Sequence, residues 1–101
     1  MWKVRFSANA EALIRKLIKE GRISESDRQV IGAWMRLVEL HGPEALREQR
    51  RWDDHALEHE WAGFRSSAYS PAGRIIYKVV EDKIVVVVVR ITPDHDYGTE
   101  E

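Results

Sequence analysis

The chain has 101 residues, a length that accommodates one domain built around one hydrophobic core. Its 44% hydrophobic and 33% charged residues are typical of a folded soluble protein and exclude disorder as the default state. The absence of cysteine excludes disulfides and cysteine-ligated metal sites, and the formal net charge of −1 lacks the overall basicity typical of nucleic-acid-binding proteins. We therefore expect a single domain over residues 1–101, in which 93–101 form an acidic tail.

The first part of the chain predicts a strand and a helix. Charged and apolar residues alternate over residues 2–6, which favours a short strand and gives no signal for export or membrane insertion. We therefore expect a cytoplasmic protein. Apolar residues then recur at helical spacing from Ala10 to Ile18, and Gly21 follows them as expected after a helix C-terminus.

A second helix is predicted directly after the first. Ser24 and Asp27 have the spacing of a capping box, and the Gly42–Pro43 pair ends the apolar periodicity that follows. The two helices are expected to form a hairpin. Beyond them we expect a helical turn around Ala45 and Leu46, and then an irregular connection that lasts until residue 60.

The C-terminal half has the character of strands separated by turns. The predicted strands are residues 61–69, 74–80 and 84–92, and the connections are 70–73 and 81–83. Short connections favour an antiparallel meander. The sequence thus predicts an α+β fold in which both helices pack on one face of the sheet.

The last strand is expected to have two different faces. Its wholly apolar face, Val85, Val87, Val89 and Ile91, should pack on the helices. The alternate face ends in Arg90 and should be the working face, unless its valines are covered by the C-terminal segment. A three-residue turn before this strand would place Arg90 opposite Arg74, whereas a two-residue turn would put the two arginines on opposite faces.

Several segments together resemble the RelE/YafQ/YoeB branch of the RelE/ParE superfamily: His55–Leu57, Glu60–Arg65, Gly73–Val79, Ile84–Arg90 and His95–Tyr97. The resemblance implies a toxin that a cognate antitoxin protein inhibits and that cleaves mRNA in the A site of the ribosome. It also implies cleavage without a metal or another cofactor. Attack by the ribose 2′-hydroxyl on the adjacent phosphate requires a base, a cation at the phosphate and an acid at the leaving oxygen.

The resemblance assigns catalytic roles to five side chains. Arg74 corresponds to the arginine that holds the scissile phosphate, with Arg90 as a second candidate. His95 and Tyr97 resemble the C-terminal His and Tyr of YoeB-like members, and His55 resembles a histidine that YafQ-like members carry before the sheet. Each residue also has a non-catalytic alternative. Arg74 could pair only with acidic residues of the antitoxin, and Arg90 could form an ordinary ion pair. His55 could be a surface histidine, and His95 and Tyr97 could belong to a solvated tail.

Further basic residues are candidates for RNA binding. Arg65 and Lys78, with Arg74 and Arg90, would give a locally positive sheet face within a neutral total charge. The local cluster of Arg47, Arg50 and Arg51 can contact RNA phosphates, or it is a solvated loop whose charges Glu44 and Glu48 balance. The sequence departs from YafQ-like members at Ala68, Tyr69 and Ala72, where a histidine and an acid would be expected.

Other functions remain open at this point. A ParE-like protein that binds and poisons DNA gyrase needs no acid or base, and a degenerate member would bind its antitoxin without being toxic. The segment from His55 to His59 also matches the H-x-x-E-H pattern of zinc peptidases, although the adjoining strand and the lack of a third ligand disfavour zinc.

Overall fold

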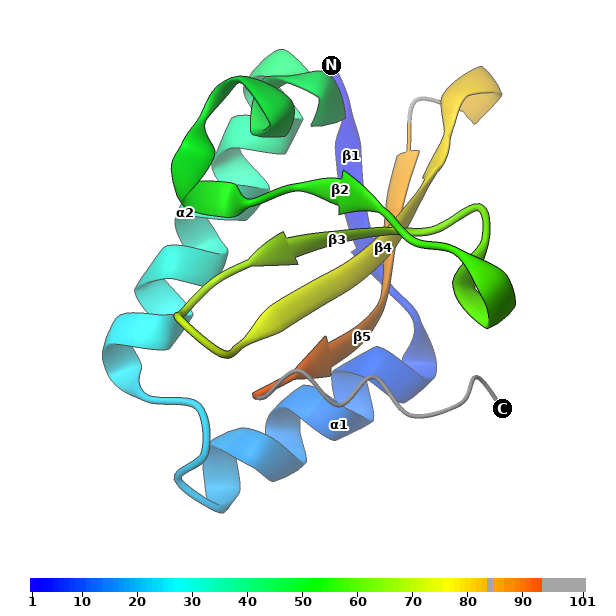
Figure 1. The fold of residues 1–101 in the computed structure, drawn as a ribbon. Helices are drawn as coiled ribbons and strands as arrows, with labels where there is room; N and C mark the ends of the chain where they lie inside the picture. Colours follow the sequence, from blue (N-terminus) through cyan, green and yellow to red (C-terminus); the bar gives the residue numbers. More distant parts are fainter. Residues whose placement is uncertain (84, 94–101) are drawn as a thin grey trace.

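The computed structural model describes residues 1–83 and 85–93 of the chain. Two α-helices, α1 (Ala8–Lys19) and α2 (Glu25–His41), accompany one five-stranded sheet (Figure 1). The strands are β1 (Lys3–Phe6), β2 (His55–Ala56), β3 (Arg65–Ala68), β4 (Arg74–Val80) and β5 (Val85–Thr92). Short 3₁₀ helices occupy the connections: η1 (Pro43–Glu48), η2 (Arg50–Trp52), η3 (His59–Trp61) and η4 (Glu81–Lys83).

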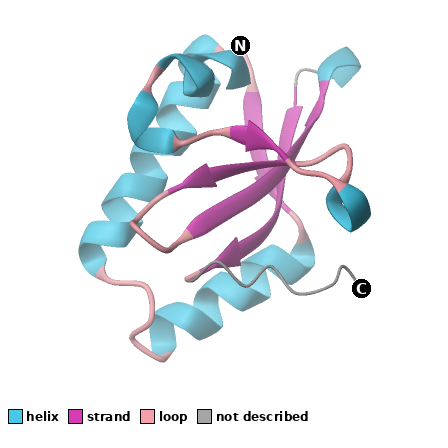
Figure 2. Cartoon of the chain, viewed as in Figure 1, coloured by secondary structure: helices cyan, strands magenta, loops and turns pink. Residues whose placement is uncertain are grey.

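The sheet has the strand order β1-β5-β4-β3-β2 (Figure 2). Strands β3, β4 and β5 are antiparallel neighbours, which confirms the predicted meander. The N-terminal strand β1 pairs in parallel with β5, although the two helices and the strands β2, β3 and β4 lie between them in the chain. The two-residue strand β2 extends the opposite edge and lies in a segment for which only an irregular connection was predicted.

Both helices begin where the sequence predicts. Ser7 accepts a hydrogen bond from the backbone N–H of Ala10, and Ser24 forms the predicted capping box with Asp27. Helix α2 ends at Gly42, whose φ of +84° is costly for residues with a Cβ and whose missing side chain leaves room for the Trp2 ring. No helix of the described chain is long and apolar enough to cross a bilayer.

The main core lies between the helices and one face of the sheet. Helix α1 packs against β1 and β5, and α2 packs against β1. Trp34 of α2 is fully buried and meets Tyr77 of β4 edge-on, with 5.2 Å between the ring centroids. We call this side of the sheet the helix-facing side and the opposite side the outer face.

The valines of β5 that enter this core are not the predicted ones. Val86 and Val88 are each 0% exposed although they were assigned to the other face, whereas Ile91, also 0% exposed, is buried as predicted. An unbroken run of valines contains no polar residue that would mark which face is inside, so alternation alone cannot fix the orientation of the strand. The prediction was wrong for the valines that remain partly exposed: Val85, Val87 and Val89.

A β-bulge near the end of β5 redirects its last residues. Val88 lies opposite Tyr77, but Arg90 lies opposite Ile76, so that Val89 is an extra residue on this strand. The bulge shifts the alternation by one position and brings Arg90 onto the outer face. Neither turn length considered from the sequence applies, because Val80 pairs with Val85. Ile84, the predicted first residue of this strand, lies outside the described residues.

The strand predicted over residues 61–69 is shorter in the structure. Trp61 ends η3, and the strand begins only at Arg65. His59 and Gly63 have φ values of +57° and +93°, which interrupt an extended backbone. Lys78 of the outer face lies over the ring of Phe64, so the segment after η3 lies beside that face.

Candidate functional site

Arg74 lies at the start of β4 with its side chain on the outer face. Its Nε donates to Ser66 Oγ at 2.7 Å, and its Nη1 donates to the Asp53 carboxylate at 3.0 Å. Its Nη2 donates to the carbonyl oxygens of Asp53 at 2.9 Å and of Ser66 at 3.3 Å. The Arg74 side chain is 3% exposed, whereas that of Asp53 is 72% exposed. The guanidinium is therefore held by several partners at once, and its only carboxylate partner among residues 1–83 and 85–93 is a surface group.

His55 of β2 lies beside this guanidinium. Its Nδ1 is 2.9 Å from the Asp53 carbonyl oxygen and 3.3 Å from Arg74 Nη2. The carbonyl oxygen only accepts, so the shorter contact requires a proton on Nδ1, and the 3.3 Å approach of Arg74 Nη2, which only donates, is then not a hydrogen bond. A neutral imidazole in this arrangement has a free lone pair on Nε2. His55 is an exposed residue.

The outer face is positively charged although the whole chain is not. Strand register places on it five cations from three strands: Lys3, Arg5, Arg74, Lys78 and Arg90. None of the residues in the described strands is acidic. The acidic side chains of the described chain belong to helices and connections, so a neutral total charge coexists with a basic sheet surface.

Arg90 is the second cation near Arg74. It lies opposite Ile76, one outer-face position along β4 from Arg74, which corresponds to a diagonal spacing of roughly 7–8 Å between such residues. Its Nε is buried and has no hydrogen-bond partner among the described residues. A buried donor without an acceptor is energetically costly.

A second polar cluster lies on the helix-facing side, around Asp54. Arg65 donates to Asp54 Oδ1 through Nε at 2.8 Å and approaches it with Nη2 at 2.7 Å. Ser67 Oγ and the Tyr77 hydroxyl donate to Oδ2 at 2.6 and 2.5 Å. The Asp54 side chain is 0% exposed, and these four contacts satisfy both of its oxygens. The cluster anchors the segment that carries Asp53 and His55 to the sheet.

The charges in this cluster change the ionisation of its members. Burial of the hydroxyl, followed by the charge and hydrogen bond of Asp54, raises the pKa of Tyr77. Burial lowers the pKa of Arg65, but the hydrogen bond and charge of Asp54 outweigh that effect and raise it overall. Tyr77 is therefore neutral and Arg65 charged at physiological pH.

Arg65 does not share a face with the other predicted RNA-binding residues. It pairs with Tyr77 on the helix-facing side, whereas Arg74, Lys78 and Arg90 lie on the outer face. Three of the four residues predicted to form a positive face therefore lie together on the outer face. The alternation of side chains along the strand directs the fourth, Arg65, to the helix-facing side.

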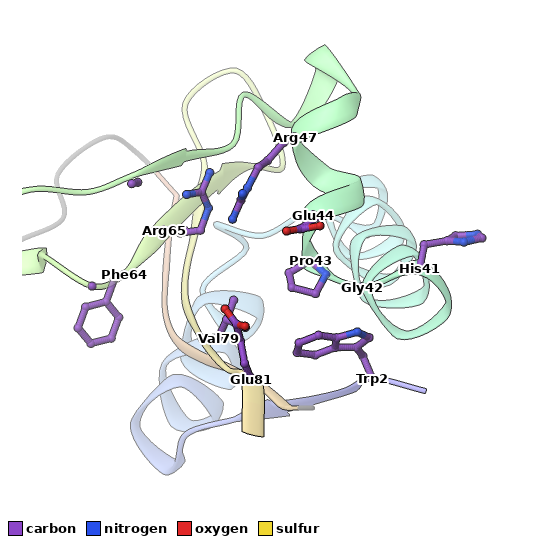
Figure 3. A pocket seen from close by; sticks show the side chains of 12 residues that line it. Trp2, His41, Gly42, Pro43, Glu44, Arg47, Phe64, Arg65, Val79 and Glu81 are labelled. Carbon is purple, nitrogen blue, oxygen red and sulfur yellow. The ribbon is translucent and has the colours of Figure 1, made fainter. Parts of the chain in front are cut away.

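Two cavities lie near these clusters. One of about 510 Å³ is lined on one side by Trp2 and Pro43 and on the other by Arg65, and Arg47 extends toward it from η1 while His41 points away (Figure 3). The other, of about 470 Å³, lies beside Arg74 and is lined also by Arg51, Trp52, Asp53 and Tyr69.

The predicted arginine cluster is divided between these cavities. Arg47, Arg50 and Arg51 are all exposed. Arg47 belongs to the larger cavity and Arg51 to the smaller one, where its guanidinium lies 4.4 Å from the ring centroid of Trp52.

Two predicted catalytic residues, His95 and Tyr97, lie outside the described residues, as does most of the acidic tail. Conversely, the structure brings forward polar residues that were not predicted as parts of a site: Asp53, Asp54, Ser66 and Ser67. An available signal was the pair of acids directly before His55, together with two consecutive serines inside a strand.

The H-x-x-E-H segment is not helical. His55 belongs to β2 and His59 begins η3, so the two side chains do not share a helix face as in zinc peptidases. Among residues 1–83 and 85–93, no three His, Asp or Glu side chains are grouped in a way that could hold a metal ion.

The chain matches no family model and no curated protein. Among solved structures it is similar to the E. coli DinJ–YafQ complex (TM-score 0.73, 19% identity, 97% of this chain and 100% of that one) and to YafQ from E. coli BL21(DE3) (0.71, 18%, 99% and 94%). It is also similar to the YoeB–YefM complex from Staphylococcus aureus (0.67, 12%, 91% and 95%). At these identities the likeness concerns the fold. The chain therefore has the fold of the YafQ and YoeB toxins, as the resemblance implied.

Proposed function

We propose that the protein is the toxin of a type II toxin–antitoxin system and that it cleaves mRNA on the ribosome without a metal ion. The observation that carries this proposal is the pairing of His55 with Arg74. One carbonyl oxygen, that of Asp53, contacts both the imidazole Nδ1 and the guanidinium Nη2. A base and a phosphate-binding group are thereby fixed side by side on a basic surface, as cleavage by 2′-hydroxyl attack requires.

In the proposed reaction the 2′-oxygen bonds to phosphorus while its proton passes to Nε2 of His55. The bond from phosphorus to the 5′-oxygen breaks, which leaves a 2′,3′-cyclic phosphate and a 5′-hydroxyl. Arg74 and Arg90 stabilise the negative charge that develops on the phosphoryl oxygens. The 5′-oxygen takes its proton from an acid, for which His95 remains the prediction, and Tyr97 remains a predicted contact to the RNA.

The other outer-face cations extend the proposed RNA surface. Lys3, Arg5 and Lys78 are exposed and lie on the same side of the sheet as Arg74. Arg47 and Arg51 would contact RNA phosphates, while Arg50 has no assigned contact. Binding that depends on such contacts weakens steeply with added salt.

The proposed partner is a cognate antitoxin protein. The YafQ and YoeB structures include complexes with DinJ and YefM. In this chain the proposed antitoxin-binding surface is the basic outer face. An antitoxin segment with acidic side chains would fit onto this face and would block its access to RNA.

Mapping of message ends by primer extension after induced expression tests the nuclease proposal. The wild-type chain should cut messages within translated frames, and His55→Asn should reduce cleavage by about 100-fold or more because the base is lost. His59→Asn is the matched control. His59 is an exposed histidine four residues away with φ +57°, a conformation that Asn tolerates, and its replacement should leave cleavage unchanged.

Equal cleavage by wild type and His55→Asn would remove His55 from the mechanism, and uncut messages during growth arrest would refute the nuclease. Arrest with DNA-damage signalling and intact messages would instead identify the ParE-like activity on gyrase. Expression without arrest in a host that lacks the antitoxin would identify a non-toxic member.

A further inference from the structure

The cavity beside Arg74 is lined by two cations and by an anion that can move away from them. Arg74 and Arg51 both line it, and so does Asp53, whose carboxylate is bonded to Arg74 Nη1 at 3.0 Å. Arg51 has no acidic partner among the described residues. The two guanidinium groups thus border a space in which, among the described residues, Asp53 supplies the only carboxylate.

The orientation of Arg74 does not depend on that carboxylate. Ser66 Oγ holds Nε, and the backbone oxygens of Asp53 and Ser66 hold Nη2. If the Asp53 side chain rotates away, the guanidinium keeps three of its contacts and presents both N–H groups of Nη1 to the cavity. The side chain that must rotate is 72% exposed, so it can be rehydrated.

The backbone of Asp53 favours this arrangement. Asp53 caps η2 in a left-handed conformation with φ 43° and ψ 46°, and its N–H donates to the carbonyl of Arg50 at 3.0 Å. Aspartate is one of the few residues that adopt this conformation readily. Glycine and asparagine adopt it too, so both can replace Asp53 with little backbone strain.

We propose that this cavity is the subsite for one phosphate of single-stranded RNA, and that the Asp53 carboxylate occupies the phosphate position in the free protein. This inference rests on the proposed function, because it takes RNA as the molecule that supplies the phosphate. A phosphate oxygen replaces the carboxylate on Arg74 Nη1, and Arg51 on Trp52 contacts the same group from the other side. Asp53 thereby acts as an internal competitor that weakens binding to isolated phosphate groups.

Fluorescence anisotropy with a 2′-O-methylated RNA of about ten nucleotides tests the proposal, since a site for single-stranded RNA spans several nucleotides. The probe cannot be cleaved by 2′-hydroxyl attack and needs no ribosome, so the result does not depend on the nuclease activity. Asp53→Gly and Asp53→Asn should bind it about two- to fivefold more tightly than wild type, the range expected for loss of one exposed competing charge. Inorganic phosphate should compete more effectively for these variants than for wild type.

Glu11→Gln is the control for net charge. Glu11 is an exposed acid on α1, paired with Arg15 and outside the cavity, and its removal should change affinity much less. In an Arg51→Ala background the gain from Asp53→Gly should shrink, because both groups act on one phosphate.

Affinity that is equal in wild type and both Asp53 variants, or a gain of the same size in Glu11→Gln, would overturn the proposal. Inorganic phosphate that fails to compete with the RNA in Asp53→Gly would also overturn it, because the shared anion position would then be absent. Thermal unfolding of each variant identifies any loss of fold, and two chemically different replacements of Asp53 guard against it.

Discussion

Asp53 and Asp54 are consecutive residues, yet each binds an arginine on a different side of the sheet. Asp54 is 0% exposed and its partner Arg65 is 20% exposed, whereas Asp53 is 72% exposed and its partner Arg74 is 3% exposed. The more buried side chain is therefore the aspartate in the Asp54 pair and the arginine in the Asp53 pair. An acid that is fully enclosed by donors serves structure, and a buried cation whose acid lies at the surface can exchange that acid for another anion.

The largest expected effect breaks the buried pair. Asp54→Ala leaves Arg65, Ser67 and Tyr77 without their common acceptor, and removal of one partner from a buried ion pair costs about 3–5 kcal/mol. Since Arg65 can be partly rehydrated, we expect a loss near the lower end, about 3 kcal/mol, in the free energy of unfolding measured with urea.

The corresponding change in the other pair is Asp53→Asn. It should cost less than about 1 kcal/mol, because the carboxylate is largely hydrated, the amide oxygen can still accept from Arg74, and three other contacts hold that guanidinium. Losses of similar size in both variants would contradict the distinction between a structural pair and an exchangeable one.

An intermediate effect is expected at Tyr77, whose hydroxyl donates to Asp54. Tyr77→Phe keeps the ring that meets Trp34 but deprives a buried carboxylate of one donor, which costs about 1–3 kcal/mol. Urea unfolding at neutral pH measures the loss. A fully stable Tyr77→Phe variant would show that Arg65 and Ser67 suffice for Asp54.

The pH dependence of the same variant gives a second readout. Because the pKa of Tyr77 is raised on folding, its contribution to stability is fully present below the unfolded value of about 10 and decreases as pH rises above it. The difference in unfolding free energy between wild type and Tyr77→Phe should therefore narrow between about pH 10 and pH 11. A constant difference over that interval would place the raised pKa in doubt.

The smallest effect concerns salt. Raising NaCl from about 0.1 to about 1 M shortens the screening length from roughly 10 to 3 Å. The stability difference between wild type and Asp53→Asn should disappear under these conditions, whereas most of the Asp54→Ala difference should persist. Equal attenuation of both differences, measured by urea unfolding at the two salt concentrations, would indicate that the Asp54 pair is also reached by solvent ions.

Local sequence signals predicted much of the fold. Ser24 with Asp27 marks a helix start because the two side chains satisfy N–H groups that no helical carbonyl reaches. The strand from Arg74 to Val80 was predicted with the bounds that the structure has. Such features depend on residues close together in the chain, so they can be read without knowledge of the rest of the molecule.

The candidate site was predicted in part. Arg74, Arg90 and His55 were named from the sequence, and the structure places Arg74 and His55 in contact. Asp53 and Asp54 were missed because an acid before a strand is usually a solvated loop residue. Only pairing with β3 and β4 reveals that one of them is buried.

The sequence by itself determined the order of the two α-helices and of every strand except β2, because caps, breaks and periodicity act within one or two turns of the chain. Tertiary structure decided which face of the valine strand is buried, because a bulge at Val89 shifts the alternation and no polar residue in the run opposes either choice. It also decided that Arg65 and Arg74 lie on different sides of the sheet. Those assignments depend on register between distant strands, where a shift of one residue reverses every side chain.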